Sequence, residues 1–312
     1  MRRRRIGDLE VSVVGIGCNQ FGPTCDAAQT ARVVGRALDL GINFFDVADE
    51  YGPEGLAEEY LGRALGPRRG EAVIATKFGH HMHGDPQRGG ASARWIERAV
   101  EDSLRRLGTD CIDLYQQHFP DPAVPAQETL AAQDRLVRAG KVRAIGCCNL
   151  EAADLRERAA IAGAQGLTRL ASAQNRLNLL RQEALEDLVP TIQALDMALL
   201  PFFPLASGML SGRYRAGEPP PADSRFGRHL PPAQARRIID RDFPRVQALD
   251  AWAAARGRTV AELAIAWLAA LPAVASVIAG ATTLAQVESN ARAGAWELTA
   301  EEWREAAALG HG

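Results

Sequence analysis

Eight short apolar runs that alternate with longer amphipathic segments constrain the fold of this chain more than any other feature. The runs are rich in Val, Ile, Leu and Phe, whereas the segments between them carry apolar residues at helical steps of three and four. Such alternation predicts parallel strands joined by helical crossovers. The runs are Val13–Cys18, Asn43–Val47, Ala72–Lys77, Cys111–Gln117, Val142–Cys147, Leu170–Gln174, Ala198–Phe203 and Ala275–Ala279.

The runs are apolar nearly throughout, which is typical of strands covered on both faces. A doubly wound open sheet is the competing architecture, and a dinucleotide-binding one would carry a GxGxxG loop after its first strand. Here Gly15 and Gly17 are followed by Gln20 in place of the third glycine. We therefore predict an α/β fold, a (β/α)8 TIM barrel that spans residues 1–312 as a single domain.

Five amphipathic segments are expected to be helices, and residues at their ends suit helix capping. Ser92 can begin one helix, and Gly41, Gly108 and Gly140 each lie just past a helix end. The expected helices are Ala27–Leu40, Ser92–Leu107, Gln127–Ala139, Leu150–Ala164 and Gln182–Leu195.

The segments outside this alternation predict a hairpin and two functional loops. Arg3–Ile6 and Glu10–Val13 flank Gly7-Asp8-Leu9, which indicates an N-terminal β-hairpin that closes the bottom of the barrel. The long connections His80–Ala91 and Ser211–Pro232 follow the third and seventh strands. Because sites in barrels are built at the carboxyl ends of strands, we expect these two loops to act as lids.

Composition excludes several classes of partner. The formal net charge of -2 predicts no attraction to nucleic acid or an anionic membrane, and the basic Arg2–Arg5 leads directly into a strand pattern. The sequence contains no run of about 18 apolar residues, so we predict no membrane-spanning helix. The five cysteines include no CxxC pair, and three lie in strand-like runs, so we expect buried free thiols in a reducing cytoplasm. Oligomeric state cannot be predicted from the sequence.

A lysine at the end of a buried strand points to a functional site. Of the 36 Lys and Arg residues only Lys77 and Lys141 are lysines, and Lys77 follows Val-Ile-Ala-Thr. An isolated buried ammonium is costly, so a partner carboxylate is expected. Asp46, Tyr51 and His118 lie at or just beyond the ends of two other apolar runs. We therefore predict that these four side chains form one site.

The four groups suit proton transfer to a developing alkoxide. A tyrosine phenol has a pKa of about 10, and a neighbouring ammonium lowers it by stabilising the phenolate. Lys77 can do this, Asp46 can hold Lys77 charged, and His118 can orient a carbonyl oxygen. The set includes neither an activated nucleophile nor a metal shell, so the electrons must come from a cofactor.

Seven segments at the predicted strand ends resemble, in order, motifs of the aldo-keto reductase family. The resemblance runs from Arg3 to Asn290. It implies a barrel that binds NADP(H), or sometimes NAD(H), and transfers hydride to an aldehyde or ketone. It also implies that Tyr51 is the general acid. The segments are NFFDVADEYG, VIATKFG, IDLYQQH, GKVRAIGCCN, ASAQN, PLASGMLSGRY and VIAGATTLAQVESN.

The same resemblance implies the cofactor contacts. Asn149 and Gln174, with Cys148 in a position usually filled by Ser, would hold the carboxamide, and Phe202 would stack under the nicotinamide. The remaining contacts are with the pyrophosphate, by Leu205, Ser207, Leu210, Arg213 and Arg225, and with the adenosine, by Gly280, Thr282, Gln286 and Asn290. Thr282 stands where many relatives carry Arg for the 2′-phosphate, so NADP(H) is preferred only modestly over NAD(H).

Other interpretations remain open at this point. Thr282 favours an NAD-dependent sugar or alcohol dehydrogenase, and the SGRYRAGEPP segment resembles nucleotide-sensing potassium channel β-subunits, although those tend to carry Asn in place of His118. A Schiff-base aldolase using Lys77 is also compatible with a barrel.

Histidines and aromatic residues near the strand ends raise two further questions. His80, His81 and His83 form an HHxH cluster, but without Cys or carboxylate partners a solvated lid is favoured over a metal site. Phe21, Phe78 and Phe119 are expected to line an apolar substrate pocket, unless they belong to the core.

Overall fold

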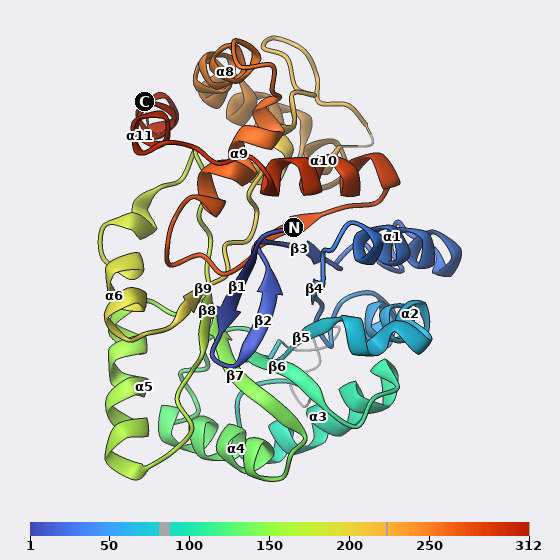
Figure 1. Ribbon diagram of the computed structural model, residues 1–312, viewed down its shortest axis with the longest axis vertical. Helices are drawn as coiled ribbons and strands as arrows, with labels where there is room; N and C mark the ends of the chain where they lie inside the picture. The colour runs from blue at the N-terminus through green and yellow to red at the C-terminus, as the bar shows by residue number, and fades with distance from the viewer. Residues whose placement is uncertain (81–87, 223, 312) are drawn as a thin grey trace.

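The centre of the molecule is a closed parallel barrel (Figure 1). The computed structural model describes residues 1–80, 88–222 and 224–311. Within these residues, eight strands form one sheet in the order β10-β3-β4-β5-β6-β7-β8-β9. A bridge between Leu199 and Val274 joins its two ends, and the amide of Ala275 donates to the carbonyl of Leu199 at 3.0 Å. The strands are β3 Val14–Gly17, β4 Phe44–Asp46, β5 Val73–Phe78, β6 Ile112–Gln117, β7 Val142–Cys148, β8 Ser172–Gln174, β9 Ala198–Leu199 and β10 Val277–Gly280.

This architecture confirms the predicted barrel, and each strand lies within or beside its predicted run. β5 and β6 are buried along their whole length, as expected for strands covered on both faces. The predicted hairpin is also present: β1 (Arg3–Ile6) pairs antiparallel with β2 (Leu9–Ser12). It lies across one end of the barrel, in front of the strands in Figure 1.

Helices surround the barrel, and most begin and end close to the predicted positions. Ser92 caps α3 by accepting from the amide of Trp95, and Gly108 ends it in a left-handed conformation. The helices among the described residues are α1 Ala27–Asp39, α2 Leu56–Leu65, α3 Ala93–Leu107, α4 Ala126–Arg138, α5 Ala152–Gln165, α6 Leu188–Ala194, α7 Arg225–His229, α8 Pro232–Ala254, α9 Val260–Ala269, α10 Leu284–Gly294 and α11 Ala300–His311. The short 3-10 helices are η1 Pro53–Gly55, η2 Gly66–Glu71, η4 Glu183–Leu185 and η5 Ala206–Ser211.

One helix prediction was wrong in extent. Gln182–Leu195 was expected to be continuous, but only η4 and the seven-residue α6 form within it. Pro190 explains the difference, because its ring would clash with the carbonyl of Glu186 in a continuous helix and it has no N–H to donate. Proline is tolerated in a first turn, so the helix begins at Leu188.

The two loops that were expected to act as lids lie after β5 and after β9. The segment Ser211–Pro232 is not irregular throughout, because it contains α7, which Ser224 caps through the amide of Gly227. In the segment after β5, residues 81–87 lie outside the described part of the chain.

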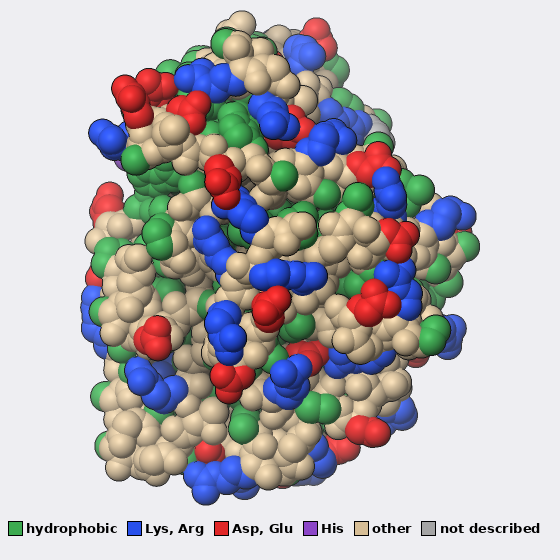
Figure 2. Space-filling model, viewed as in Figure 1, with side chains coloured by type: hydrophobic (Ala, Val, Ile, Leu, Met, Phe, Trp, Pro, Cys, Tyr) green, Lys and Arg blue, Asp and Glu red, His purple; other side chains and the backbone are tan. Residues whose placement is uncertain are grey.

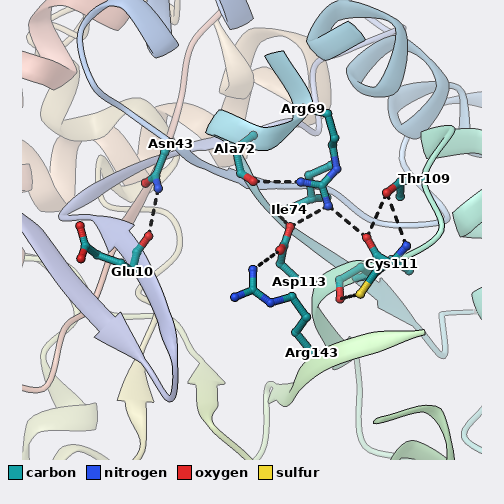
Figure 3. Close-up of polar contacts among 10 residues, drawn as sticks. Glu10, Asn43, Arg69, Ala72, Ile74, Thr109, Cys111, Asp113 and Arg143 are labelled. Atoms are coloured by element: carbon teal, nitrogen blue, oxygen red, sulfur yellow. Dashed lines mark hydrogen bonds and ion pairs between the residues drawn. The ribbon is translucent and has the colours of Figure 1, made fainter. Parts of the chain in front are cut away.

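The amino end of the barrel is tied together by a buried carboxylate (Figure 3). Asp113, in β6, accepts from Arg69 at 2.8 Å, from Arg143 in β7 at 2.8 Å and from the amide of Ile74 in β5 at 2.9 Å. Arg69 also donates to the carbonyls of Ala72 and Cys111. One side chain therefore links three adjacent strands at the end opposite the predicted site.

Replacing Asp113 should destabilise the barrel without touching the predicted site. We expect Asp113→Asn to lower the free energy of unfolding by about 2 kcal/mol, because charge-assisted hydrogen bonds to a buried carboxylate are lost. Urea denaturation followed by circular dichroism measures this change. Glu71→Gln is the control, since Glu71 pairs with Arg68 in solvent, and it should leave the midpoint unchanged. Equal effects of the two substitutions would contradict the role assigned to Asp113.

The face drawn in Figure 2 carries basic and acidic side chains interspersed, without a region of one sign. Among the described residues, none of the helices combines the length and apolar character needed to cross a bilayer.

Candidate active site

The Lys77 ammonium lies in the barrel interior with no exposed surface. It donates to Asp46 Oδ2 at 2.8 Å, to the carbonyl of Val47 at 2.8 Å and to the Tyr51 hydroxyl at 3.3 Å. Asp46 ends β4 and Lys77 lies near the end of β5, the adjacent strand. The expected carboxylate partner is therefore present, and a phenol completes the group.

Burial and charge act in opposite directions on this cluster. Burial is the largest influence on the pKa of Lys77 and lowers it, but Asp46, together with smaller contributions from Tyr51 and Cys148, more than offsets burial, so that pKa is raised and the ammonium stays charged. For Tyr51, burial raises the pKa to about 12, and Lys77 offsets only part of that effect. The sequence led us to expect a pKa below the ordinary value. In the structure Lys77 does lower the pKa of Tyr51, as predicted, but burial raises that pKa by more than Lys77 lowers it.

Asp46 is held on both oxygens. Its Oδ1 accepts from the Gln174 amide in β8 at 2.8 Å, across the barrel from β4, and Gln116 approaches the same atom at 3.5 Å. A carboxylate fixed in this way keeps Lys77 in one position. Gln174 is therefore part of the same buried network as the lysine.

His118 joins the cluster from the end of β6. Its amide donates to the carbonyl of Phe78 at 2.8 Å, and its ring lies 5.9 Å from the Tyr51 ring, edge to face. Burial, followed by Lys77 and His80, lowers the pKa of His118 well below its usual value, so the imidazole is neutral. Asn149 adopts a left-handed φ of 58° and donates to the carbonyl of His118 at 2.9 Å.

The structure also brings in two side chains that the sequence analysis did not assign to this site. Glu50 Oε2 lies 2.8 Å from His80 Nδ1, and Glu50 Oε1 lies 3.7 Å from His118 Nδ1. His80 had been considered only as part of a loop cluster. Glu50 precedes Tyr51 directly, and that adjacency was the only signal in the sequence.

Of the residues matched to the nicotinamide end, Cys148 and Gln174 end β7 and β8, and Gln174 contacts the cluster through Asp46. Cys148, at the end of β7, is buried, and burial raises the pKa of its thiol well above the usual value, so it is neutral. Phe202 is half-buried, pairs with Arg176 in an isolated bridge and packs edge to face on Phe203 at 5.1 Å.

The loop after β9 has a strained backbone, and the guanidinium of Arg225 packs against one of its aromatic rings. Phe203, Ala206 and Ser207 have positive φ angles of 53°, 48° and 58°. Such strain is concentrated at functional sites in proteins. The Arg225 guanidinium lies 4.6 Å from the Phe203 ring centroid. Leu205 and Ser207 are half-buried on this loop, Leu210 is fully buried, and Arg213 follows η5.

The residues matched to the adenosine end gather at the start of α10. Gln286 Oε1 accepts from the amide of Thr282 at 2.7 Å and from that of Thr283 at 3.2 Å. Asn290 donates to the carbonyl of Gly280 at 3.4 Å. Gln286 thus takes part in capping the helix in this structure.

Of the three phenylalanines expected to line a pocket, Phe21 and Phe78 have no exposed surface and belong to the core. This corrects the pocket prediction for those two and supports the alternative considered for them. Phe119 is 39% exposed and stacks on His118 at 4.7 Å, so it remains a candidate lining residue.

The HHxH cluster lies only partly within the described residues. No cluster of His, Cys, Asp or Glu suited to a metal occurs among residues 1–80, 88–222 and 224–311. His81 and His83 lie outside the described residues. All five cysteines are free, and four of them are buried as expected, whereas Cys111 is half-buried.

Comparison with known proteins agrees with this geometry. The model of the aldo/keto reductase family matches residues 13–310. A probable voltage-gated potassium channel subunit beta from Oryza sativa subsp. japonica is 34% identical, over 91% of this chain and 88% of the relative. L-glyceraldehyde 3-phosphate reductase from Escherichia coli O157:H7 is 29% identical, over 91% and 84% respectively. The structure of aldo-keto reductase AKR11C1 from Bacillus halodurans, in its holo form, superposes with a TM-score of 0.81 at 32% identity and covers 99% of this chain and 96% of that one.

The barrel, its buried polar cluster and these matches together define an NAD(P)H-dependent oxidoreductase. The chain belongs to the aldo/keto reductase family, as its motifs predicted.

Proposed function

We propose that this protein transfers hydride between NADP(H) and an aldehyde or ketone, with the Tyr51 hydroxyl as general acid and base. The observation that carries the proposal is the chain of contacts from Tyr51 through Lys77 to Asp46, with distances of 3.3 and 2.8 Å. A phenol next to a permanently charged ammonium can release a proton to an alkoxide and remain as a stabilised phenolate.

The residues divide the proton chemistry among them. Because the pKa of Tyr51 is raised to about 12, its hydroxyl carries a proton at neutral pH and can donate it. Lys77 then stabilises the phenolate, and Asp46 keeps Lys77 charged during the step. His118 is neutral and lies next to Tyr51, where it can position the substrate oxygen. The nicotinamide, when bound, supplies the hydride.

The residues around the cluster fit a nicotinamide dinucleotide. Asn149, Gln174 and Cys148 supply amide and thiol groups for the carboxamide, and Phe202 offers a partly open ring for stacking. The strained loop of Leu205, Ser207 and Leu210, with Arg213 and Arg225, suits the pyrophosphate, since left-handed backbone turns present amides to anions. Gly280, Thr282, Gln286 and Asn290 would contact the adenosine.

Thr282 bears on the choice between NADP(H) and NAD(H). Thr282 supplies a hydroxyl and an amide rather than a guanidinium, so the preference for NADP(H) over NAD(H) is expected to be modest. Arg213 and Arg225 can compensate by attracting the phosphates.

A panel of aldehydes and ketones tested with both cofactors examines the proposal directly. We expect oxidation of NADPH by reactive aldehydes, with kcat/KM for NADPH above that for NADH by less than about 100-fold, a difference of under about 3 kcal/mol. The kcat/KM values for NADPH and for NADH are both measured from the loss of absorbance of the reduced nicotinamide. A large preference for NAD would favour the sugar or alcohol dehydrogenase instead, and no turnover with either cofactor would reject the proposal.

The identity to probable channel β-subunits makes a nucleotide-sensing role the second candidate. It predicts tight cofactor binding without appreciable turnover, whereas the reductase predicts both. A Schiff-base aldolase is disfavoured, because the raised pKa of Lys77 keeps its amine protonated and therefore not nucleophilic. Borohydride should trap no substrate adduct on Lys77.

A further inference from the structure

A second carboxyl group in the turn that carries Tyr51 is buried without a partner. Asp49 follows Asp46 on this turn, and it is 1% exposed. Neither of its carboxyl oxygens makes a hydrogen bond among the residues that the structure describes. Asp46, by contrast, is held on both oxygens. The Asp49 amide donates to the carbonyl of Lys77 at 3.4 Å, so the turn is attached to β5 at this residue.

The groups that act electrostatically on Asp49 include buried side chains of α2 and α3, which lie side by side (Figure 1). Glu58, in α2, has no exposed surface. It accepts from Arg106 Nε in α3 at 2.7 Å and from Thr76 Oγ1 in β5 at 2.5 Å. The Tyr115 hydroxyl of β6 is buried and, within the described part of the chain, makes no hydrogen bond. Because Arg106 already compensates Glu58, an ionised Asp49 would add an uncompensated negative charge to the interior.

A proton removes this charge most simply. An isolated ionised carboxylate is far more costly in a protein interior than a neutral acid, so such a group takes up a proton instead. Burial raises the pKa of Asp49 well above its usual value, and Glu58 adds to this effect. Arg106 opposes the rise in that pKa in part, whereas the adjacent Glu50 adds to it. Tyr115 is neutral, because burial raises the pKa of its hydroxyl well above the usual value.

We propose that Asp49 binds a proton when the chain folds, and that ionisation of this carboxyl at higher pH opens the turn that carries Tyr51. The ionised side chain gains solvation by moving into water, and the backbone of the turn moves with it. Two hydrogen bonds of the Tyr51 backbone are then broken: its amide donates to the carbonyl of Ala48 at 3.1 Å, and its carbonyl accepts from the amide of Ala57 at 3.1 Å. Asp49 is thus a pH-sensitive switch next to the candidate active site.

Carbon-13 NMR of the aspartate side chains measures the protonation state without turnover, so the result does not depend on the function proposed above. At neutral pH, the carboxyl signal that is absent from Asp49→Asn should have the chemical shift of a protonated acid. It should move to that of a carboxylate only at higher pH. A carboxylate shift at neutral pH would overturn the proposal. Spectra in sodium, potassium and tetramethylammonium chloride test a bound cation in place of the proton, and a carboxylate shift in either metal salt alone would also overturn it.

The same proton should be visible in the pH dependence of folding. Because the pKa of Asp49 is raised in the folded state, its stabilising contribution is complete below the unfolded pKa of about 3.9 and is lost as the pH rises towards the folded value. Between these two values, the folding equilibrium constant should fall about tenfold per pH unit relative to that of Asp49→Asn. Urea denaturation at a series of pH values measures this ratio.

The control is Glu59→Gln, which removes the carboxylate of an exposed pair with Arg63 on α2. Its folding equilibrium constant should keep a constant ratio to that of the unmodified protein as the pH changes. The same pH dependence in Asp49→Asn as in the unmodified protein would contradict the proposal, whatever the difference in stability between them at any one pH.

Hydrogen exchange places the effect in the turn. Deuterium uptake by the peptide that contains Tyr51 should increase more steeply with pH in the unmodified protein than in Asp49→Asn. A peptide from β7 serves as the reference and should exchange alike in the two proteins. Equal uptake by the Tyr51 peptide in both proteins, or a difference as large in β7 as in the turn, would reject the switch.

Discussion

Tyr51→Phe is expected to lower kcat for aldehyde reduction by about 10²–10⁴-fold, the contribution typical of a positioned general acid. The substitution removes one hydroxyl, which accepts from Lys77 at 3.3 Å, and keeps the ring that packs against His118. Lys77 retains Asp46 and the Val47 carbonyl as partners, so its charge remains compensated. Steady-state kinetics with NADPH and a reactive aldehyde measure the loss.

The control for this prediction is cofactor affinity. The groups proposed to hold the nicotinamide, Asn149, Gln174 and Phe202, come from other strand ends. NADPH binding followed by fluorescence should therefore be the same in Tyr51→Phe as in the unmodified protein. Undiminished turnover would remove Tyr51 from the mechanism, and lost binding would mean that the substitution had disturbed the site as a whole.

Asp46→Asn is expected to destabilise the fold by about 3–5 kcal/mol, because it leaves a buried ammonium without its compensating charge. Lys77 has no exposed surface and Asp46 is 3% exposed, so solvent cannot replace the lost partner. Denaturant unfolding measures the change. Glu101→Gln, which removes the partner of the other lysine, Lys141, in an exposed pair, should cost less than about 1 kcal/mol.

The double substitution Asp46→Asn with Lys77→Met separates the cost of the charge from the cost of altered packing. If the buried ammonium causes the loss, removing it as well should restore much of the stability. A double variant no more stable than Asp46→Asn alone would show that packing or the Gln174 contact causes the loss.

The unmodified protein and Asp46→Asn should also differ in how the free energy of unfolding depends on pH. In the unmodified protein the pKa of Lys77 is raised above its unfolded value, so the stabilisation is fully present below the unfolded pKa of about 10.4 and is lost only above it. In Asp46→Asn the main group that opposes burial is removed, so we expect burial to lower the pKa of Lys77. The unfolded state then binds more protons, and stability should rise with pH between the lowered pKa and about 10.4.

Much of the fold was accessible from the sequence because local pattern and tertiary structure agree. The apolar runs that became β5 and β6 are buried throughout, and Gly108 ends α3 as its position indicated. The four polar groups were predicted to meet because the carboxyl ends of parallel strands share one end of a barrel. Lys77 and Asp46 do meet there at 2.8 Å.

The parts of the fold and the site that could not be predicted from the sequence depend on tertiary packing, which no local sequence pattern encodes. The pKa of Tyr51 is set mainly by burial, which the sequence does not display, rather than by Lys77. The contact of Glu50 with His80 joins residues 30 positions apart. Phe21 and Phe78 follow strand ends as Phe119 does, yet only packing determines that the first two are in the core.

The most direct test of the central claim is isotope transfer from NADPH carrying deuterium on the transferring face of the nicotinamide C4. With an aldehyde substrate, the account predicts an alcohol with deuterium on the carbinol carbon, and in heavy water the solvent should label only the exchangeable hydroxyl, which receives its proton through Tyr51. A carbinol carbon that takes its hydrogen from solvent, or intact NADPH after prolonged incubation with reactive aldehydes, would contradict it.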